Sequence, residues 1–119
     1  MSKIVMLVPG VESYMLDANL SLETMQKIVN GNIEVIYPFS DPVALVCNED
    51  GKLIDLALNR VLKDDDGNVY DIVAGAAFIC GIDEENFVGL TDELAHKYCD
   101  MFKIPPMFLN IDGKVYIFE

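Results

Sequence analysis

The sequence predicts an α+β fold, a mainly antiparallel sheet built from Asp-Gly hairpins, with two helices. Two sequence patterns and the length of the chain support this prediction. The dipeptide Asp-Gly occurs at residues 50–51, 66–67 and 112–113, each time between runs of strand-forming residues. Asp-Gly suits the two central positions of a type I′ turn, where both residues need a positive φ. Two other segments carry apolar residues at helical spacing behind a capping residue, and 119 residues suffice for one domain, residues 1–119.

Each Asp-Gly dipeptide predicts one hairpin. The expected partners are 43–49 with 52–56, 60–64 with 68–72, and 107–111 with 114–118. Runs rich in β-branched residues at 3–8 and 33–39 predict further strands. We therefore expect five to seven strands.

The most apolar run of the chain, Asp71 to Ile82, predicts a central strand covered on both faces. Its small residues Gly75, Ala76 and Ala77 indicate close approach of a neighbouring element. The alternative is that they leave a hollow for a ligand.

The first predicted helix follows Ser21, a plausible N-cap, and ends at Gly31. Its apolar face is expected to contain Leu22, Met25, Ile28 and Val29. The second follows Thr91, with an expected apolar face of Leu94, Tyr98, Met101 and Phe102. Lys103 suits the negative end of that helix dipole.

Charge and hydropathy narrow the functional classes. The chain carries 20 acidic and 8 basic residues, a net charge of −12, and 52% of its residues are hydrophobic. This charge disfavours direct binding to nucleic acid or to an anionic membrane surface. No signal-peptide pattern and no apolar run of about 20 residues is present. We expect a soluble, cytoplasmic protein.

The residues that carry catalysis are sparse, so we expect no enzyme and no cofactor. The single histidine, His96, falls on the second predicted helix without zinc-ligand spacing, and no phosphate-binding or nucleophile motif occurs. Cys47, Cys80 and Cys99 are widely spaced, which favours buried, reduced thiols.

The three consecutive aspartates at 64–66 belong to a predicted hairpin tip, where water solvates them. Aligning Gly67 with the glycine of a calcium loop puts Leu62 and Val73 at ligand positions, so the match fails. We predict no metal site; loose divalent-ion binding by the three aspartates is the alternative.

The chain resembles a known family. The segments YPFSDPVALVCNEDGKL, LNR and DIVAGAAFICG, within residues 33–81, match in order the core of domain-of-unknown-function family 3846. The first strand and helix also fit, and the tail beyond Phe102 fits less well. The resemblance implies a setting, small accessory proteins of bacterial genomes, phages and mobile elements, and no mechanism.

Five residues form the candidate ligand-binding set: Asn59, Arg60, Tyr37, Asn48 and Tyr70. Arg60 is the only arginine, and its planar guanidinium suits phosphate or carboxylate. Tyr37 and Asn48 are expected to form a polar cluster with Arg60 if the strands bring them together. The alternative for Arg60 is a structural ion pair with Asp55, Asp64 or Asp71.

These features leave three hypotheses for a non-catalytic accessory protein in host-defence evasion. The protein sequesters a small nucleotide signal, with Asn59 and Arg60 on phosphate and Tyr37 or Tyr70 stacking on the base. Or it binds a host protein directly through apolar surface, with self-association into an oligomer as a further expectation. Or it is an acidic DNA mimic that inhibits a DNA-binding enzyme. A housekeeping role is the remaining alternative.

Overall fold

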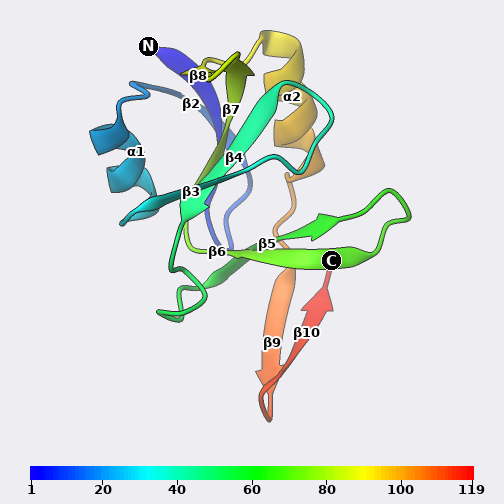
Figure 1. Ribbon diagram of the computed structural model, residues 1–119. Helices are drawn as coiled ribbons and strands as arrows, with labels where there is room; N and C mark the ends of the chain where they lie inside the picture. The colour runs from blue at the N-terminus through cyan, green and yellow to red at the C-terminus, as the bar shows by residue number, and fades with distance from the viewer.

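A six-stranded antiparallel sheet forms the centre of the computed structural model, which describes residues 1–119 (Figure 1). The elements in chain order are β1 (Ser2–Leu7), β2 (Tyr14–Ala18), α1 (Leu22–Val29), β3 (Ile33–Ile36), β4 (Val43–Asn48), β5 (Leu58–Lys63), β6 (Val69–Ala74), β7 (Ala77–Asp83), β8 (Asn86–Val88), α2 (Asp92–Met101), β9 (Met107–Ile111) and β10 (Lys114–Phe118). The main sheet has the order β2-β1-β7-β4-β3, with β8 paired to β7. Two further hairpins, β5–β6 and β9–β10, form separate two-stranded sheets. The predicted α+β class with two helices is confirmed.

Both faces of the central sheet are covered, because its strands are apolar at successive positions. Val5 and Leu7 of β1 belong to a core that also contains α2 and residues of the β5–β6 hairpin. Ile4 and Met6 point to the opposite face, where they pack with α1. The two helices accordingly lie on opposite sides of the sheet (Figure 1).

The predicted helix starts are confirmed. The Ser21 hydroxyl accepts a hydrogen bond from the Thr24 N–H at 3.2 Å, and the Thr91 hydroxyl accepts one from the Leu94 N–H at the same distance. Helix α1 ends at Asn30, whose φ of 60° is left-handed, one residue before the expected Gly31.

Two expected apolar contacts are wrong. Leu22 of α1 and Met101 of α2 are 56% and 52% exposed. Leu22 is the first helical residue, and the buried residues of the helix are Met25 and Val29 in its later turns. Lys103 follows α2 and pairs with Glu12, so it does not lie in the last helical turn as expected.

The three Asp-Gly dipeptides have three different outcomes. At Asp112-Gly113 both φ values are positive, 52° and 81°, and the β9–β10 hairpin has the predicted two-residue turn. The β5–β6 hairpin is confirmed, but only Gly67 has a positive φ, so its turn is not type I′. The Asp64 carboxylate instead accepts hydrogen bonds from the N–H groups of Asp66 and Asn68 and closes a longer loop.

The hairpin predicted at Asp50-Gly51 is wrong. Residues 49–55 form turns and β4 pairs with β3 and β7. Gly51 is buried against β6, since a Cβ there would lie 2.7 Å from the Ala74 carbonyl oxygen. This tertiary contact, and not a two-residue hairpin turn, explains why a glycine occurs at this position.

The single strand predicted over residues 71–82 is also wrong. It divides at Gly75, whose φ of +81° ends β6, and β7 then enters the other sheet. The second half behaves as expected, because β7 lies between β1 and β4 with both faces buried. The expected close neighbour is Leu56, which a Cβ on Gly75 would meet at 2.7 Å.

Strands β2 and β8 were not expected, and the ten strands exceed the five to seven predicted. Both are short and lie beside strands of the main sheet. None of the helices is long and apolar enough to cross a lipid bilayer.

Candidate functional site

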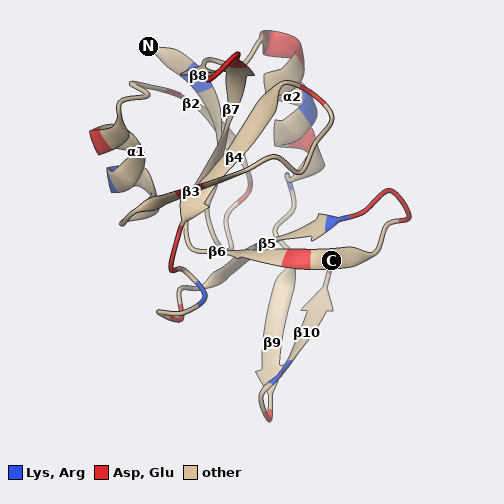
Figure 2. Ribbon diagram, in the orientation of Figure 1, with Lys and Arg blue, Asp and Glu red and all other residues tan.

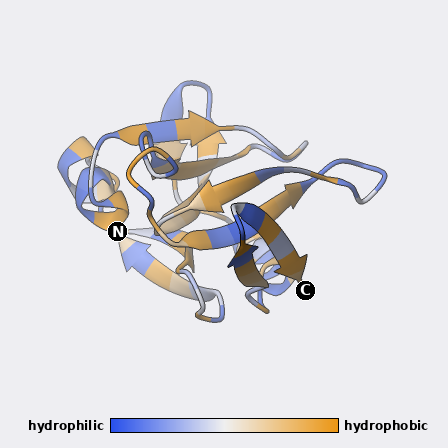
Figure 3. Cartoon of the chain, turned by 90° about the horizontal axis from the view of Figure 1, so that it is seen from below, coloured by the Kyte–Doolittle hydropathy of each residue, from blue (hydrophilic) through white to orange (hydrophobic).

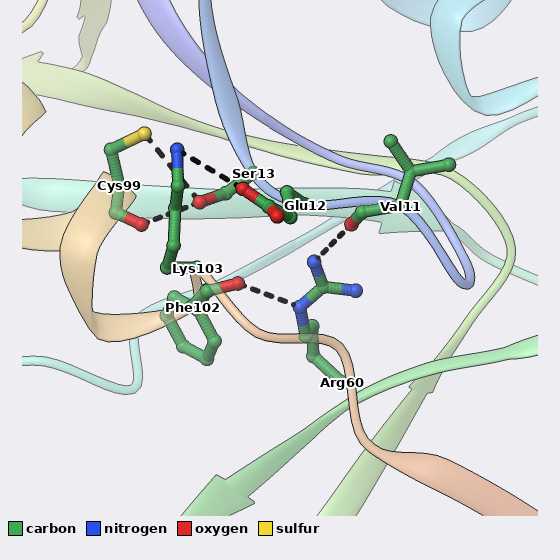
Figure 4. A network of polar contacts seen from close by, with 7 residues as sticks. All are labelled: Val11, Glu12, Ser13, Arg60, Cys99, Phe102 and Lys103. Carbon is green, nitrogen blue, oxygen red and sulfur yellow. Dashed lines mark hydrogen bonds and ion pairs between the residues drawn. The ribbon is translucent and has the colours of Figure 1, made fainter.

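Asn59 and Arg60 lie buried at the junction of three elements, with 0% and 1% of their surface exposed. The Arg60 Nε–H donates to the carbonyl oxygen of Phe102 at the end of α2, over 3.0 Å. Its Nη2 donates to the carbonyl oxygen of Val11 at 2.6 Å (Figure 4). Its Nη1 donates to the carbonyl oxygen of Val8 at 3.3 Å. The guanidinium therefore joins β5 to the β1–β2 loop and to α2.

The amide of Asn59 completes this network. Its nitrogen donates to the carbonyl oxygens of Leu7 and Gly75, both at 2.8 Å, while its oxygen accepts from Arg60 Nη1 at 2.9 Å. A second buried hydrogen bond also joins the β1–β2 loop to α2, because the Ser13 hydroxyl donates to the Cys99 carbonyl oxygen at 2.5 Å (Figure 4). Asn59 and Arg60 thus direct their polar atoms into the interior of the fold.

The ion pair predicted for Arg60 is wrong, since no carboxylate lies within pairing distance of it. Asp71 pairs with Lys52, and Asp64 closes its own turn. Backbone carbonyl oxygens take the place of the counter-ion, one of them at the negative end of the α2 dipole. Burial lowers the pKa of the Arg60 guanidinium.

The five candidate residues do not converge. The Asn48 amide donates to the carbonyl oxygens of Val29 and Asn30 and accepts from the Asp50 N–H. Tyr37 and Tyr70 are 65% and 56% exposed and make no hydrogen bond to Arg60. The predicted cluster of Tyr37, Asn48 and Arg60 is therefore absent. The two buried side chains, Asn48 and Arg60, instead form hydrogen bonds with separate backbone groups.

Each lysine side chain also has a partner within the chain. Six of the seven form ion pairs with carboxylates, and Lys114 instead lies over the Tyr116 ring, 5.4 Å from its centroid. Only six of the 20 acidic residues take part in these pairs. The remaining acids lie mostly in loops and at turn tips (Figure 2). The uncompensated charge of the surface is thus negative.

The largest hollow is a groove of about 1260 Å³ between the two hairpins. It is lined by nine hydrophobic residues among 16, including Leu56, Leu58, Tyr70, Ile72, Phe108 and Val115. Its charged residues are Lys52, Asp55 and Asp71. Burial alone would raise the pKa of Asp71, but hydrogen bonds from Lys52 and from the Ile72 N–H lower it on balance.

A smaller pocket of about 400 Å³ lies beside α2. Its wall contains the aromatic rings of Phe39, Tyr98 and Phe102. The centroid of the Phe39 ring lies 4.6 Å from that of Tyr98 and 6.0 Å from that of Phe102. Lys63 and Lys97 at its rim already pair with Glu119 and Asp41. A third hollow of about 290 Å³ contains Asn48.

Of the candidate set, Tyr70 alone lines the large groove. Sequence reasoning missed the other walls of the groove, because they come from three segments that periodicity does not connect. No three His, Cys, Asp or Glu side chains form a group that could hold a metal ion. The arrangement offers apolar contact area and no set of reactive groups.

A known family matches the part of the chain that forms the core of the fold. A family model described as "Domain of unknown function (DUF3846)" matches residues 1–103, which include the central sheet, both helices and the β5–β6 hairpin. The chain belongs to this family. Within DUF3846 the matched region contains the Arg60 network, whereas the β9–β10 hairpin lies beyond it. No curated protein and no solved structure matches the chain.

Proposed function

We propose that this DUF3846 protein is a non-catalytic accessory protein that binds a host protein through the groove between its two hairpins. The observation that carries the proposal is the combination of an apolar groove with a surface whose cations are already paired. The partner segment that fits is extended, apolar in the groove and basic in its flanks, because it meets a molecule of charge −12. The setting of the family, phages and mobile elements, favours host-defence evasion as the role.

The volume of the groove favours a protein segment over a small ligand. Small-molecule sites usually enclose about 300–1,000 Å³, and this groove is larger and open between two hairpins. A chain lying in it would contact Tyr70 on one wall and Phe108 on the other. Aromatic side chains of this kind supply much of the affinity in protein interfaces.

The nucleotide hypothesis has weaker support. Arg60, its expected phosphate donor, is 1% exposed and donates to four backbone carbonyl oxygens and the Asn59 amide. The pocket beside α2 has a suitable volume and aromatic walls, so it is where a nucleotide would bind. Its rim lysines would first have to leave Glu119 and Asp41.

Site-specific photocrosslinking tests the proposal. A photoreactive phenylalanine analogue replaces Phe108, on the wall of the groove that faces Tyr70, and the protein is irradiated in lysate of the natural host. We expect one dominant crosslinked protein that Val69→Ser/Tyr70→Ser abolishes and that weakens as salt rises. Leu16→Ser/Leu22→Ser is the matched control, since these leucines are 42% and 56% exposed, against 40% and 56% for Val69 and Tyr70.

The outcomes separate the hypotheses. A crosslink that persists in the groove variant overturns the assignment of the groove. Extra mass of nucleotide size in native mass spectrometry, with no groove-dependent crosslink, favours the nucleotide signal instead. A captured DNA-binding enzyme released by added duplex DNA favours the DNA mimic.

A further inference from the structure

The β9–β10 hairpin has one apolar face that nothing in the chain covers. Opposite residues of an antiparallel pair lie on the same face, so the register assigns each side chain. Met107 faces Phe118, Leu109 faces Tyr116, and Ile111 faces Lys114. These six residues form the outer face of the hairpin. The strands are largely hydrophobic in the view from below (Figure 3).

The exposures confirm which face is outward. The five apolar residues of the outer face, Met107, Leu109, Ile111, Tyr116 and Phe118, are between 40% and 61% exposed. On the inner face, the pair Phe108 and Ile117 is half-buried, whereas the pair Asn110 and Val115 nearer the turn is exposed. A solvated strand face is ordinarily polar, and here Lys114 is its one charged residue.

The hairpin has little else to hold it. Its strands pair only with each other, and a two-stranded sheet is marginal by itself in water. Its connection to the rest of the chain includes the Lys63–Glu119 ion pair, 2.7 Å long. A second layer on the outer face would supply the missing burial.

We propose that a second copy of this chain covers the outer face, so that the two hairpins pack face to face across a twofold axis. Of the six outer-face residues only Leu109 also lines the groove, and the inference goes beyond the proposed function. No carboxylate on this face repels a second copy, because the face contains no acid although the molecule carries −12. Two copies meet through the one apolar strip without opposing carboxylates.

The area fits a weak dimer. Half-exposed side chains of this size each offer on the order of 100 Å², so five give about 500 Å² per copy. The total of about 1,000 Å² is at the lower limit for a specific interface. The repulsion between two molecules of charge −12 opposes association, so salt strengthens this dimer, whereas it weakens contacts with a basic partner.

Sedimentation velocity on the full chain tests the proposal. Between about 5 and 500 µM we expect the weight-average sedimentation coefficient to rise from the monomer to the dimer value. Raising the salt from about 50 to 500 mM should shift this transition to lower concentration. Met107→Lys/Ile111→Lys should remain monomeric throughout.

The substitutions are chosen so that charge cannot explain the loss. Two added lysines reduce the net charge from −12 toward −10, which by itself would favour association. Leu16→Lys/Leu22→Lys makes the same charge change at side chains of comparable exposure and should dimerise. Circular dichroism checks that both variants fold. A wild-type monomer at every concentration, or a dimer that survives in Met107→Lys/Ile111→Lys, overturns the proposal.

Discussion

Arg60 donates a hydrogen bond from Nε to the backbone carbonyl oxygen of Phe102, 42 residues later in the chain, over 3.0 Å. Helix α2 has no basic residue in its last turn, and Arg60 supplies the missing cation from β5. The same guanidinium donates to Val8 and Val11 in the β1–β2 loop. One buried side chain therefore fixes the β5–β6 hairpin against both the central sheet and α2.

Arg60→Ala should destabilise the fold strongly, because three carbonyl oxygens lose a charged donor in a buried site. A buried acceptor left unsatisfied costs about 1–3 kcal/mol, so we expect a loss of about 3–5 kcal/mol in the free energy of unfolding, measured by urea denaturation. Arg60→Lys should also cost about 1–3 kcal/mol, since an ammonium group cannot match the planar fork. Lys27→Ala, which removes an exposed pair with Glu23, should change stability by only about 0.5 kcal/mol. Wild-type stability in Arg60→Lys would contradict this structural role.

The sequence identified Asn59 and Arg60 as unusual, and both are buried, yet it suggested the wrong partners. Asp55, Asp64 and Asp71 are near Arg60 in sequence, which favours an ion pair. Apart from the neighbouring Asn59, the actual acceptors are backbone carbonyl oxygens 42 to 52 residues away. Every residue has a carbonyl group, so no side-chain pattern marks which ones will face an arginine.

Gly75→Ala should destabilise the protein more than Gly67→Ala does. Both glycines have a φ near +80°, so each variant bears a similar backbone strain of about 1 kcal/mol. A Cβ on Gly75 would lie 2.7 Å from Leu56 Cδ1, whereas a Cβ on Gly67 meets nothing within 4 Å. Thermal unfolding of the two variants measures the difference. Equal losses would mean that Leu56 moves aside without cost.

Local turns were easier to predict than the positions where tertiary contacts interrupt a strand or a hairpin. Asp112-Gly113 gives the expected turn because few other contacts constrain it. Asp50-Gly51 has the same chemistry, but contact with Ala74 decides its conformation. The division of residues 71–82 at Gly75 likewise depends on which sheet each half joins. Hydrophobicity alone shows that both halves are buried and not where the chain turns.

Asp41 should contribute to stability in a pH-dependent way. Hydrogen bonds from Lys97 and Tyr98, each 2.6 Å long, hold the pKa of its carboxyl below the usual value. A depressed pKa in the folded state contributes stability that is complete above the unfolded pKa, about 3.9, and is lost as the pH falls through the folded pKa. The Tm of Asp41→Asn should therefore lie below that of the wild type at pH 7, and the two should converge as the pH falls through the folded-state pKa of Asp41.

The control for Asp41 is Lys97→Met, which removes the same ion pair from its other side. Its Tm difference from the wild type should shrink over the same acidic range. A difference for Asp41→Asn that stays constant down to the lowest pH would show that the carboxylate charge contributes nothing and that only the shape of the side chain matters.

The three cysteines should be unreactive in the native protein, although they are reduced. All three are buried, as the sequence predicted, and none forms a disulfide. Burial, together with the nearby Glu34 carboxylate, raises the pKa of the Cys47 thiol to about 11, and burial raises that of Cys80 to about 12. Since the thiolate is the nucleophile, a disulfide reagent at pH 8 should label no cysteine before the protein unfolds and three per chain in guanidinium chloride. Leu53→Cys, at a position 83% exposed, should add one thiol that reacts at once and so verifies the reagent. Prompt reaction of a native cysteine would instead reveal local opening of the central sheet, because Cys47 and Cys80 lie on its strands β4 and β7.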